Sequence, residues 1–237
     1  MHQLTFFSTC FPCVKPSQLP ILRRRIIWVL SCNANQLDVT SPLNPLGMLA
    51  SALSSHNDIC TRLTAVQAME ALLPQCEDQR SILQSIVEPT VPALYQLANE
   101  CTELQSRIEC LDLLSNLITY VSGSLSTLSN GVLNAIVAPL STIWANSVDQ
   151  NLLLKRNVLG ILSCVASFVG PDQVTVLHPL ALPLIDDSLS REENVFLVEE
   201  ALQLWWVFLR LSKTYDPNLG KLYIRAAELS RDLEHVK

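Results

Sequence analysis

Histidine side chains, together with serine, cysteine and carboxylate partners, are the residues through which this chain could carry out catalysis. The four histidines are His2, His56, His178 and His235, and none of them stands in a known nucleophile motif. A Ser-His-Asp relay can be assembled from distant residues, but the sequence carries no signature of one. With only six glycines, the chain also has no loop that would cradle a phosphate group. We therefore predict no enzyme, no catalytic residue and no cofactor.

The cysteines could instead support metal or redox chemistry. Cys10 and Cys13 form the one CxxC pair, and no second pair or paired histidines complete a zinc site. Five others are scattered along helical stretches, as is typical of small buried side chains in a reducing compartment: Cys60, Cys76, Cys101, Cys110 and Cys164. The sequence therefore predicts neither a metal site nor a disulfide framework.

The composition restricts the classes of partner. The chain has 237 residues, of which 49% are hydrophobic and 16% charged, so it can bury a core and is not disordered as a whole. A net charge of −6 argues against binding to nucleic acid, which calls for a basic face. The uncharged stretch 113–148 is interrupted by serine, threonine, asparagine and glycine, so we expect two packed helices there and no membrane span.

A helical pattern that repeats along the chain must position any functional side chain. Arg24, Arg62, Arg107, Arg156 and Glu200 each lie near the start of an apolar stretch, at intervals of about 38 to 49 residues. This range brackets the length of a HEAT or armadillo unit, in which two antiparallel helices pack on the next pair. We predict an all-α, right-handed superhelical solenoid of about five such pairs over residues 21–237, after an irregular leader at 1–20.

Local signals set the expected helices. The first pair should occupy 21–31 and 46–54, and Asp58 should cap the next helix by accepting a backbone hydrogen bond in its first turn. The apolar positions of that helix form one stripe, which consists of Ile59, Leu63, Val66, Met69 and Leu73. Its partner should span about 81–99.

Later stripes follow the same rule. They consist of Leu104, Ile108, Leu111, Leu114, Ile118 and Val121, then Ile136, Leu140 and Ile143, then Leu154, Val158, Ile161, Val165 and Phe168, and finally Leu197, Ala201, Leu204, Phe208 and Leu211. Gly170-Pro171 and Asp216-Pro217 should separate helices, and residues 122–124 should form a turn. Prolines recur inside the second helices of three successive pairs, which suggests bent helices along one curved wall: Pro89 and Pro92, Pro139, and Pro179 and Pro183.

Charged and aromatic clusters are the candidate binding residues. Residues 23–25 are three arginines, which we interpret as a solvated helix start in preference to a basic docking patch. Several acidic residues form a ridge near a turn and a helix start: Asp186, Asp187, Glu192 and Glu193, followed by residues 199–200. Their negative charge stabilises the start of a helix through the helix dipole, and it could also bind a basic segment of a cargo protein. We take the first four as candidate binding residues. Adjacent tryptophans point about 100° apart on a helix, so we expect Trp205 or Trp206 to be in the core and assign Trp206 to the candidate binding surface.

Three segments resemble a known family. They are residues 24–30 (RRIIWVL), 62–65 (RLTA) and 197–205 (LVEEALQLW), which are similar to the central repeats of an importin-β-type nuclear transport receptor. The likeness extends from about residue 21 to 211. Residues 31–35 depart from the family's pattern after the first tryptophan.

The resemblance implies a HEAT-repeat receptor that carries a cargo protein through nuclear pores, binds Ran-GTP to release that cargo and touches phenylalanine-glycine nucleoporins. It implies a location in nucleus and cytoplasm and at the nuclear envelope. In the family the amino-terminal repeats bind Ran, so we expect this chain to be a fragment or shortened relative that does not bind Ran by itself. The alternatives are a generic HEAT scaffold of another assembly and an enzyme or enzyme regulator with an unrecognised site.

Overall fold

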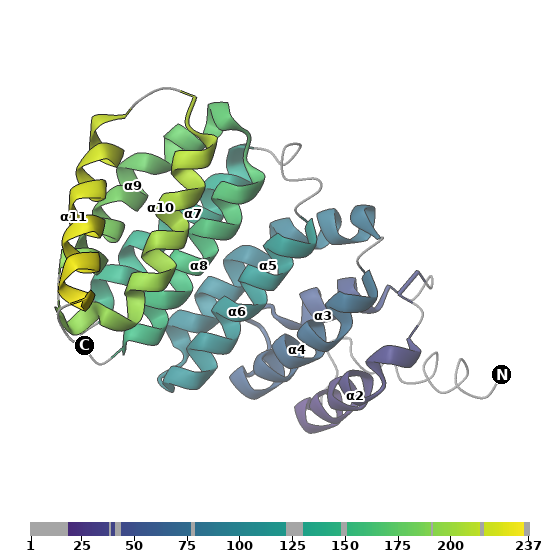
Figure 1. The fold of residues 1–237 in the computed structure, drawn as a ribbon. Helices are drawn as coiled ribbons and strands as arrows, with labels where there is room; N and C mark the ends of the chain where they lie inside the picture. The colour runs from purple at the N-terminus through teal and green to yellow at the C-terminus, as the bar shows by residue number, and fades with distance from the viewer. Residues whose placement is uncertain are drawn as a thin grey trace. The chain divides into compact units, whose positions relative to one another are not determined.

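The computed structural model describes residues 19–37, 39–40, 44–76, 79–121, 130–147, 151–190, 192–213 and 216–234 (Figure 1). In these ranges every regular element is a helix, which confirms the all-α prediction. The chain divides into two compact units, Met1–Ile136 and Val137–Lys237. The predicted CxxC pair, His2, His235 and the turn at 122–124 lie outside the described residues.

The first unit contains successive pairs of helices. They are α2 (Pro20–Cys32) and α3 (Pro45–Ala52), α4 (Ile59–Leu72) and α5 (Arg80–Glu100), and then α6 (Leu104–Val121). Short 3₁₀ segments follow α2 and α4, at Ala34–Gln36 and Leu73–Cys76. α2 packs on α4 and α4 on α6, while α3 packs on α5. First helices therefore contact first helices and second helices contact second helices, as stacked helical repeats require.

The second unit repeats this arrangement. α7 (Asn130–Asn146) contains the boundary between the units, and it is followed by α8 (Leu152–Phe168), α9 (Pro171–Ser190), the 3₁₀ segment Glu192–Leu197, α10 (Val198–Leu211) and α11 (Pro217–Glu234). α8 packs on α10 and α9 packs on α11. The stacking is consistent with the predicted solenoid, whose handedness and number of pairs stay predictions. Among the described helices, none is long and apolar enough to cross a membrane.

Caps and prolines define the helix ends as the sequence indicated. The Asp58 carboxylate accepts a hydrogen bond from the Thr61 backbone N–H at 2.9 Å, which confirms the predicted cap. α8 ends at Phe168, before the Gly170-Pro171 break, and Pro171 and Pro217 are the first residues of α9 and α11. Asn44 caps α3 from a left-handed conformation (φ 42°) and accepts a bond from the Gly47 N–H.

The prolines inside α5, α7 and α9 do not end these helices. Pro139 is half-buried, and the other four are exposed: Pro89, Pro92, Pro179 and Pro183. A proline has no N–H, so each removes one helical hydrogen bond. Because four of the five rings are exposed, most of these bonds are lost at solvent-accessible positions.

Most apolar stripes are buried as predicted. Leu111, Leu114, Ile118 and Val121 line the core of the first unit, and Leu154, Val158, Ile161 and Val165 line that of the second. The stripe of α4 is partly wrong, because Ile59 is 43% exposed and Leu63 is half-buried. The helix packs against α2, α3 and α6, so its buried face is broader than one stripe and includes Thr61, Arg62, Ala65 and Ala68.

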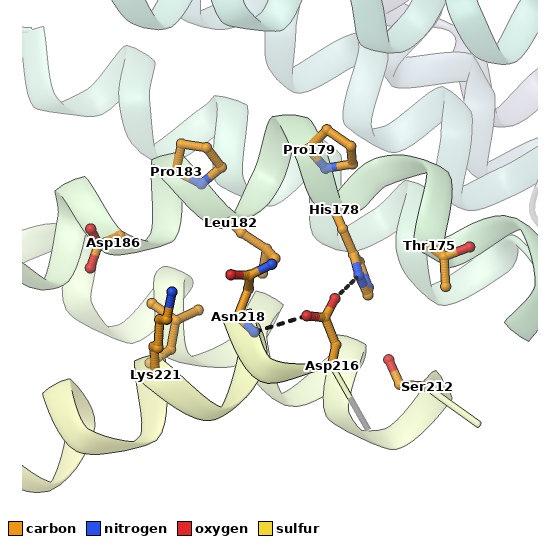
Figure 2. A pocket seen from close by; sticks show the side chains of 11 residues that line it. Thr175, His178, Pro179, Leu182, Pro183, Asp186, Ser212, Asp216, Asn218 and Lys221 are labelled. Carbon is orange, nitrogen blue, oxygen red and sulfur yellow. Dashed lines mark hydrogen bonds and ion pairs between the residues drawn. The ribbon is translucent and has the colours of Figure 1, made fainter. Parts of the chain in front are cut away.

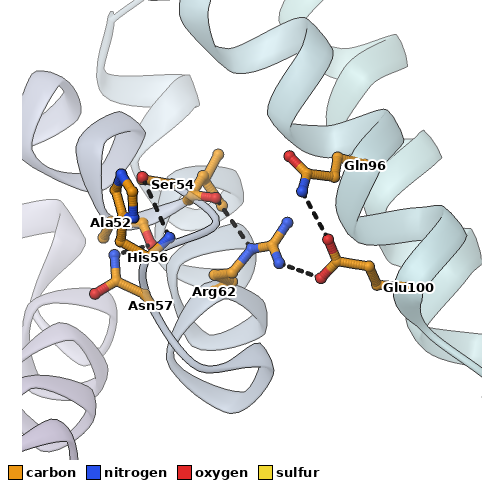
Figure 3. A network of polar contacts seen from close by, with 8 residues as sticks. Ala52, Ser54, His56, Asn57, Arg62, Gln96 and Glu100 are labelled. Atoms are coloured by element: carbon orange, nitrogen blue, oxygen red, sulfur yellow. Dashed lines mark hydrogen bonds and ion pairs between the residues drawn. The ribbon is translucent and has the colours of Figure 1, made fainter.

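A polar network at the end of α3 explains why an arginine is buried there (Figure 3). Arg62 is 1% exposed, its Nε donates to the Leu53 carbonyl at 3.0 Å, and one terminal nitrogen pairs with Glu100 at the end of α5. The Asn57 side chain donates to the Ala52 carbonyl at 2.9 Å. The last carbonyls of a helix have no partner within it, so these two side chains satisfy the end of α3.

Two further expectations about solvent exposure are wrong. Arg23, predicted at a solvated helix start, is buried and donates to the Asn57 side chain, because α2 packs directly on α4. Cys60, predicted to be buried, is exposed, since it lies in the first turn of α4 on the side away from the core. Cys76, Cys101 and Cys110 are buried as expected.

Candidate functional site

A cleft of about 810 Å³ lies between α9 and α11 in the second unit (Figure 2). α9 lines it with Thr175, His178, Pro179, Leu182, Pro183 and Asp186, and the residues after α10 and on α11 line it with Ser212, Asp216, Asn218, Lys221 and Leu222. Both α9 and α11 are second helices of their pairs. The cleft therefore occurs where two neighbouring repeats present their second helices side by side.

A histidine and an aspartate join the two walls of the cleft. His178 Nδ1 lies 2.9 Å from Asp216 Oδ2, so in the neutral ring the proton is placed on Nδ1 and Nε2 is an acceptor. The other Asp216 oxygen accepts from the Asn218 backbone N–H at 2.8 Å, at the start of α11. This backbone hydrogen bond holds the pKa of the Asp216 carboxyl below its ordinary value. The Asp216 carboxylate thus has two roles: it caps α11 and it orients the His178 imidazole.

The inner end of the cleft contains two buried polar atoms without partners. His178 is 7% exposed, its ring meets the Phe208 ring edge-on with centroids 5.0 Å apart, and its Nε2 has no hydrogen bond within the described residues. The Ser212 Oγ is buried and unpartnered in the same way. A buried polar group without a partner costs about 1–3 kcal/mol. The cleft therefore has hydrogen-bonding capacity that no described residue satisfies.

Asp216, His178 and Ser212 are the residue types of a nucleophilic triad. A triad requires the imidazole Nε2 to accept a hydrogen bond from the serine hydroxyl. Here neither Nε2 nor Oγ has a hydrogen-bond partner within the described residues, so the relay is not assembled. The arrangement is suited to binding a polar group, and it does not activate Ser212.

The remainder of the cleft combines an apolar floor with charged ends. Pro179, Leu182 and Pro183 form its centre, and Asp186 lies at the far end of α9 from His178 (Figure 2). Asp186 is exposed, with a weak 3.5 Å contact from the Ser190 hydroxyl. Lys221 on α11 is also exposed. Among the described residues, no group of three or more histidines, cysteines or carboxylates could hold a metal ion.

The structure separates the members of the predicted acidic ridge. Asp186 lines the cleft, whereas Asp187 accepts from Trp144 Nε1 at 3.3 Å and lies 4.0 Å from Lys155 Nζ. Lys155 is buried over the Trp144 ring, 5.2 Å from its centroid. Asp187 therefore serves the contact between α7, α8 and α9, and Asp186 is the member that faces the cleft.

The other acidic candidates have different surroundings. Glu192 and Glu193 lie in the 3₁₀ segment before α10, and their side chains are outside the described part of the structure. In the pair that follows, Glu199 is exposed and Glu200 pairs with Arg156 of α8. Arg156 and Glu200, two of the residues that marked the repeat in the sequence, thus connect successive first helices.

The two tryptophans of α10 take different positions. Trp205 is half-buried, donates from Nε1 to the Leu219 carbonyl at 3.2 Å and lies 6.3 Å from the Tyr223 ring. Trp206, the candidate for a binding surface, is 62% exposed. The side chain of Trp205 is thus occupied in holding α11 on α10, and that of Trp206 is available to a partner.

The His178–Asp216 pair was not among the residues selected from the sequence. Its signal was present, since the two residues are 38 positions apart, which is within the repeat interval. Residues about one repeat apart lie on neighbouring helix pairs, and here a side chain from within α9 meets the residue that precedes α11. A search for complementary side chains at that spacing would have found them.

Comparison with known proteins bears on the same part of the chain. Residues 156–236, which include the whole cleft and Trp206, match a family model described as importin-11-like TPR repeats. Importin-11 of Mus musculus is 26% identical over 207 residues, which are 85% of this chain and 20% of that protein. The chain resembles importin-11. The importin-11 of Homo sapiens gives the same values.

The likeness to importin-11 confirms the resemblance inferred from residues 24–30, 62–65 and 197–205. It is a likeness to part of a larger protein, because the chain spans about a fifth of the length of the curated relatives it matches. The matched family is described by TPR repeats and the sequence suggested HEAT repeats. Both are stacks of helix pairs, which is the arrangement seen in each unit.

Proposed function

We propose that this chain acts in protein import into the nucleus, as an importin-β-type transport receptor or as a segment of one. Its partners would be a cargo protein, Ran-GTP and phenylalanine-glycine nucleoporins, and it would move between cytoplasm and nucleus through the nuclear pore. The observation that carries this proposal is the similarity to importin-11 over 207 residues. The activity would consist of binding and release, without catalysis.

The arrangement of the helices supports a role in polypeptide binding. Stacked helix pairs present long continuous faces, which repeat proteins use to contact other chains. In the second unit these faces carry large exposed apolar side chains, among them Phe196 at 76% and Trp206 at 62%. Exposed aromatic residues of this kind contribute strongly to protein interfaces. We assign the first contact with cargo to the second unit for this reason, through Trp206 together with Asp186, Glu192 and Glu193. Asp187, predicted with them, is left out because Trp144 and Lys155 already engage it.

Nuclear entry and nucleotide-dependent binding test the proposal. The intact gene product, fused to a fluorescent protein, is added to permeabilised cells beside the fluorescent protein alone. We expect the fusion to collect at the nuclear envelope and in the nucleus, and a product that also carries amino-terminal repeats to bind immobilised Ran more strongly with GTP than with GDP.

A generic helical scaffold gives a different result. It would show the same nuclear level as the fluorescent protein alone and equal binding to the two nucleotide forms of Ran. That pair of results would contradict the transport function, whereas nuclear accumulation with cargo release by Ran-GTP would support it.

A further inference from the structure

The cleft between α9 and α11 is lined by more carboxylates than cationic side chains. Asp216 contributes a carboxylate and His178 contributes Nε2 at the inner end, and Asp186 contributes a second carboxylate at the outer end. Among the described residues that line the cleft, Lys221 is the one lysine or arginine. With two carboxylates against one ammonium group, the cleft has a net negative charge while His178 is neutral.

The prolines of α9 add a main-chain acceptor to this set. Pro183 has no N–H, so the carbonyl of Pro179 cannot receive the hydrogen bond that a helix normally supplies from four residues ahead. Pro179 and Pro183 are both exposed and both line the cleft. The Pro179 carbonyl therefore lacks its usual helical partner, at a residue that lines the cleft.

Two buried polar atoms at the inner end of the cleft have no hydrogen-bond partner within the described residues. His178 is more than nine-tenths buried and projects from α9 toward α11 (Figure 2), yet its Nε2 has no partner within the described residues. The Ser212 Oγ beside the same cleft is also unpartnered. With Nδ1 committed to Asp216, a neutral His178 needs a donor at Nε2. A group with N–H donors would supply the donor that Nε2 lacks.

We propose that this cleft binds the side chain of a single arginine in a segment of a partner protein. The guanidinium has five N–H donors in a planar fork, which suits an acceptor set of this kind, and its charge complements the two carboxylates. Its methylene stem lies on the apolar floor formed by Leu182 and the two prolines. A volume of about 810 Å³ exceeds that of one side chain, so residues that flank the arginine also enter.

This inference rests on the proposed function only in that the occupant belongs to another polypeptide. It requires neither Ran nor the nuclear pore. The binding of an arginine peptide and nuclear entry are measured separately, so either one can fail while the other holds.

The test is an NMR titration of the full chain with a capped peptide of sequence Gly-Ser-Arg-Ser-Gly. The matched probe contains citrulline in place of arginine, which keeps the shape of the side chain and removes its charge. We expect backbone amide shifts near Asn218 and Lys221 with the arginine peptide, and about tenfold weaker binding of the citrulline peptide, since charge-assisted hydrogen bonds are roughly twice as strong as neutral ones.

Variants locate the binding on the cleft. Asp186→Asn removes an exposed carboxylate and leaves the fold unchanged, and Asp216→Asn keeps a side chain that can cap α11. Each of these two substitutions should weaken the binding of the arginine peptide about fivefold. Glu88→Gln on α5 removes the same charge from an exposed site of the first unit and should change the affinity less than twofold.

Three results would overturn the proposal. These are equal binding of the citrulline and arginine peptides, amide shifts confined to other helices, and an Asp186→Asn variant that binds the arginine peptide as tightly as the parent chain. The thermal midpoint of each variant is measured alongside, so that a loss of folding is recognised.

Discussion

Replacing Arg62 with methionine tests whether a buried arginine holds the repeats of the first unit together. Methionine retains most of the volume of the side chain and removes its charge and donors. The buried Leu53 carbonyl would then lose the bond from Arg62 Nε, now 3.0 Å long. An unsatisfied buried carbonyl costs about 1–3 kcal/mol. Glu100 would lose its ion pair, but its side chain is 35% exposed and can be hydrated, so this loss adds at most about 1 kcal/mol.

We therefore expect Arg62→Met to destabilise the first unit by about 2–4 kcal/mol. The matched variant is Glu100→Gln, which leaves the bond from Arg62 to Leu53 intact and retains an acceptor for the arginine. It should cost about 1 kcal/mol or less. The difference between the two variants is the central expectation, because it separates the capping of α3 from the ion pair between α4 and α5.

Amide hydrogen exchange measured by mass spectrometry is the suitable assay. Three of the four tryptophans lie in the second unit, so fluorescence would follow the wrong part of the chain. Exchange of the amides in α4 reports the opening free energy of that helix directly. Equal protection of α4 in the parent and in Arg62→Met would refute the argument, as would an effect of Glu100→Gln as large as that of Arg62→Met.

Three further perturbations test other parts of the structure. Leu114 is fully buried, so Leu114→Ala should cost about 2–5 kcal/mol in urea unfolding, and a change within error would show that its stripe is not a core. Asp58→Ala should cost about 1 kcal/mol through loss of the α4 cap. The hydrogen bond from the Thr61 hydroxyl lowers the pKa of Asp58 in the folded chain. The stabilisation by Asp58 is therefore fully present above the ordinary pKa of the carboxyl and is lost as the pH falls through the lowered pKa. If Asp58→Ala cost as much stability in strong acid as at neutral pH, this reasoning would be contradicted. Burial raises the pKa of Cys110 to about 12 while Cys60 is exposed, so iodoacetamide at pH 8 should label Cys60 far faster, as peptide mapping would show; equal labelling would mean that α6 is not packed as described.

The sequence was sufficient for the helices because their ends depend on local chemistry. Asp58, Gly170-Pro171 and Asp216-Pro217 act within one turn of their own position, through a cap or a missing N–H. The stripe of α6 was also predictable from Leu111 onward, where its leucine, isoleucine and valine members are buried; Leu104 and Ile108 are half-buried. These features do not depend on what the neighbouring repeats contribute.

The burial of α4 could not be predicted in the same way. A count of apolar residues identifies Ile59 and passes over Arg62, although Arg62 is in the core and Ile59 is exposed. Arg62 is buried because the end of α3 and the end of α5 both supply acceptors to it. That arrangement is a property of three elements together, and one helix pattern does not contain it.

The candidate cleft was missed for a related reason. His178, Ser212 and Asp216 come from α9 and from the segment that joins α10 to α11, and no pair of them is adjacent in the sequence. The 100° angle between consecutive helical residues predicted that Trp205 and Trp206 would have different surroundings. Which of the two is exposed depends on the packing of α11 against Trp205, which the sequence of α10 does not contain.

The short reach of the contacts between repeats has a consequence for synthesis. Gln67 and Glu109 are 42 residues apart, Trp144 and Asp187 are 43 apart, and Arg156 and Glu200 are 44 apart. Each hairpin thus finds its packing surface on the hairpin made just before it. Ordering can begin at the ribosome while the carboxyl-terminal half is still untranslated, and each newly emerged hairpin covers the apolar side of its predecessor before that side meets other nascent chains.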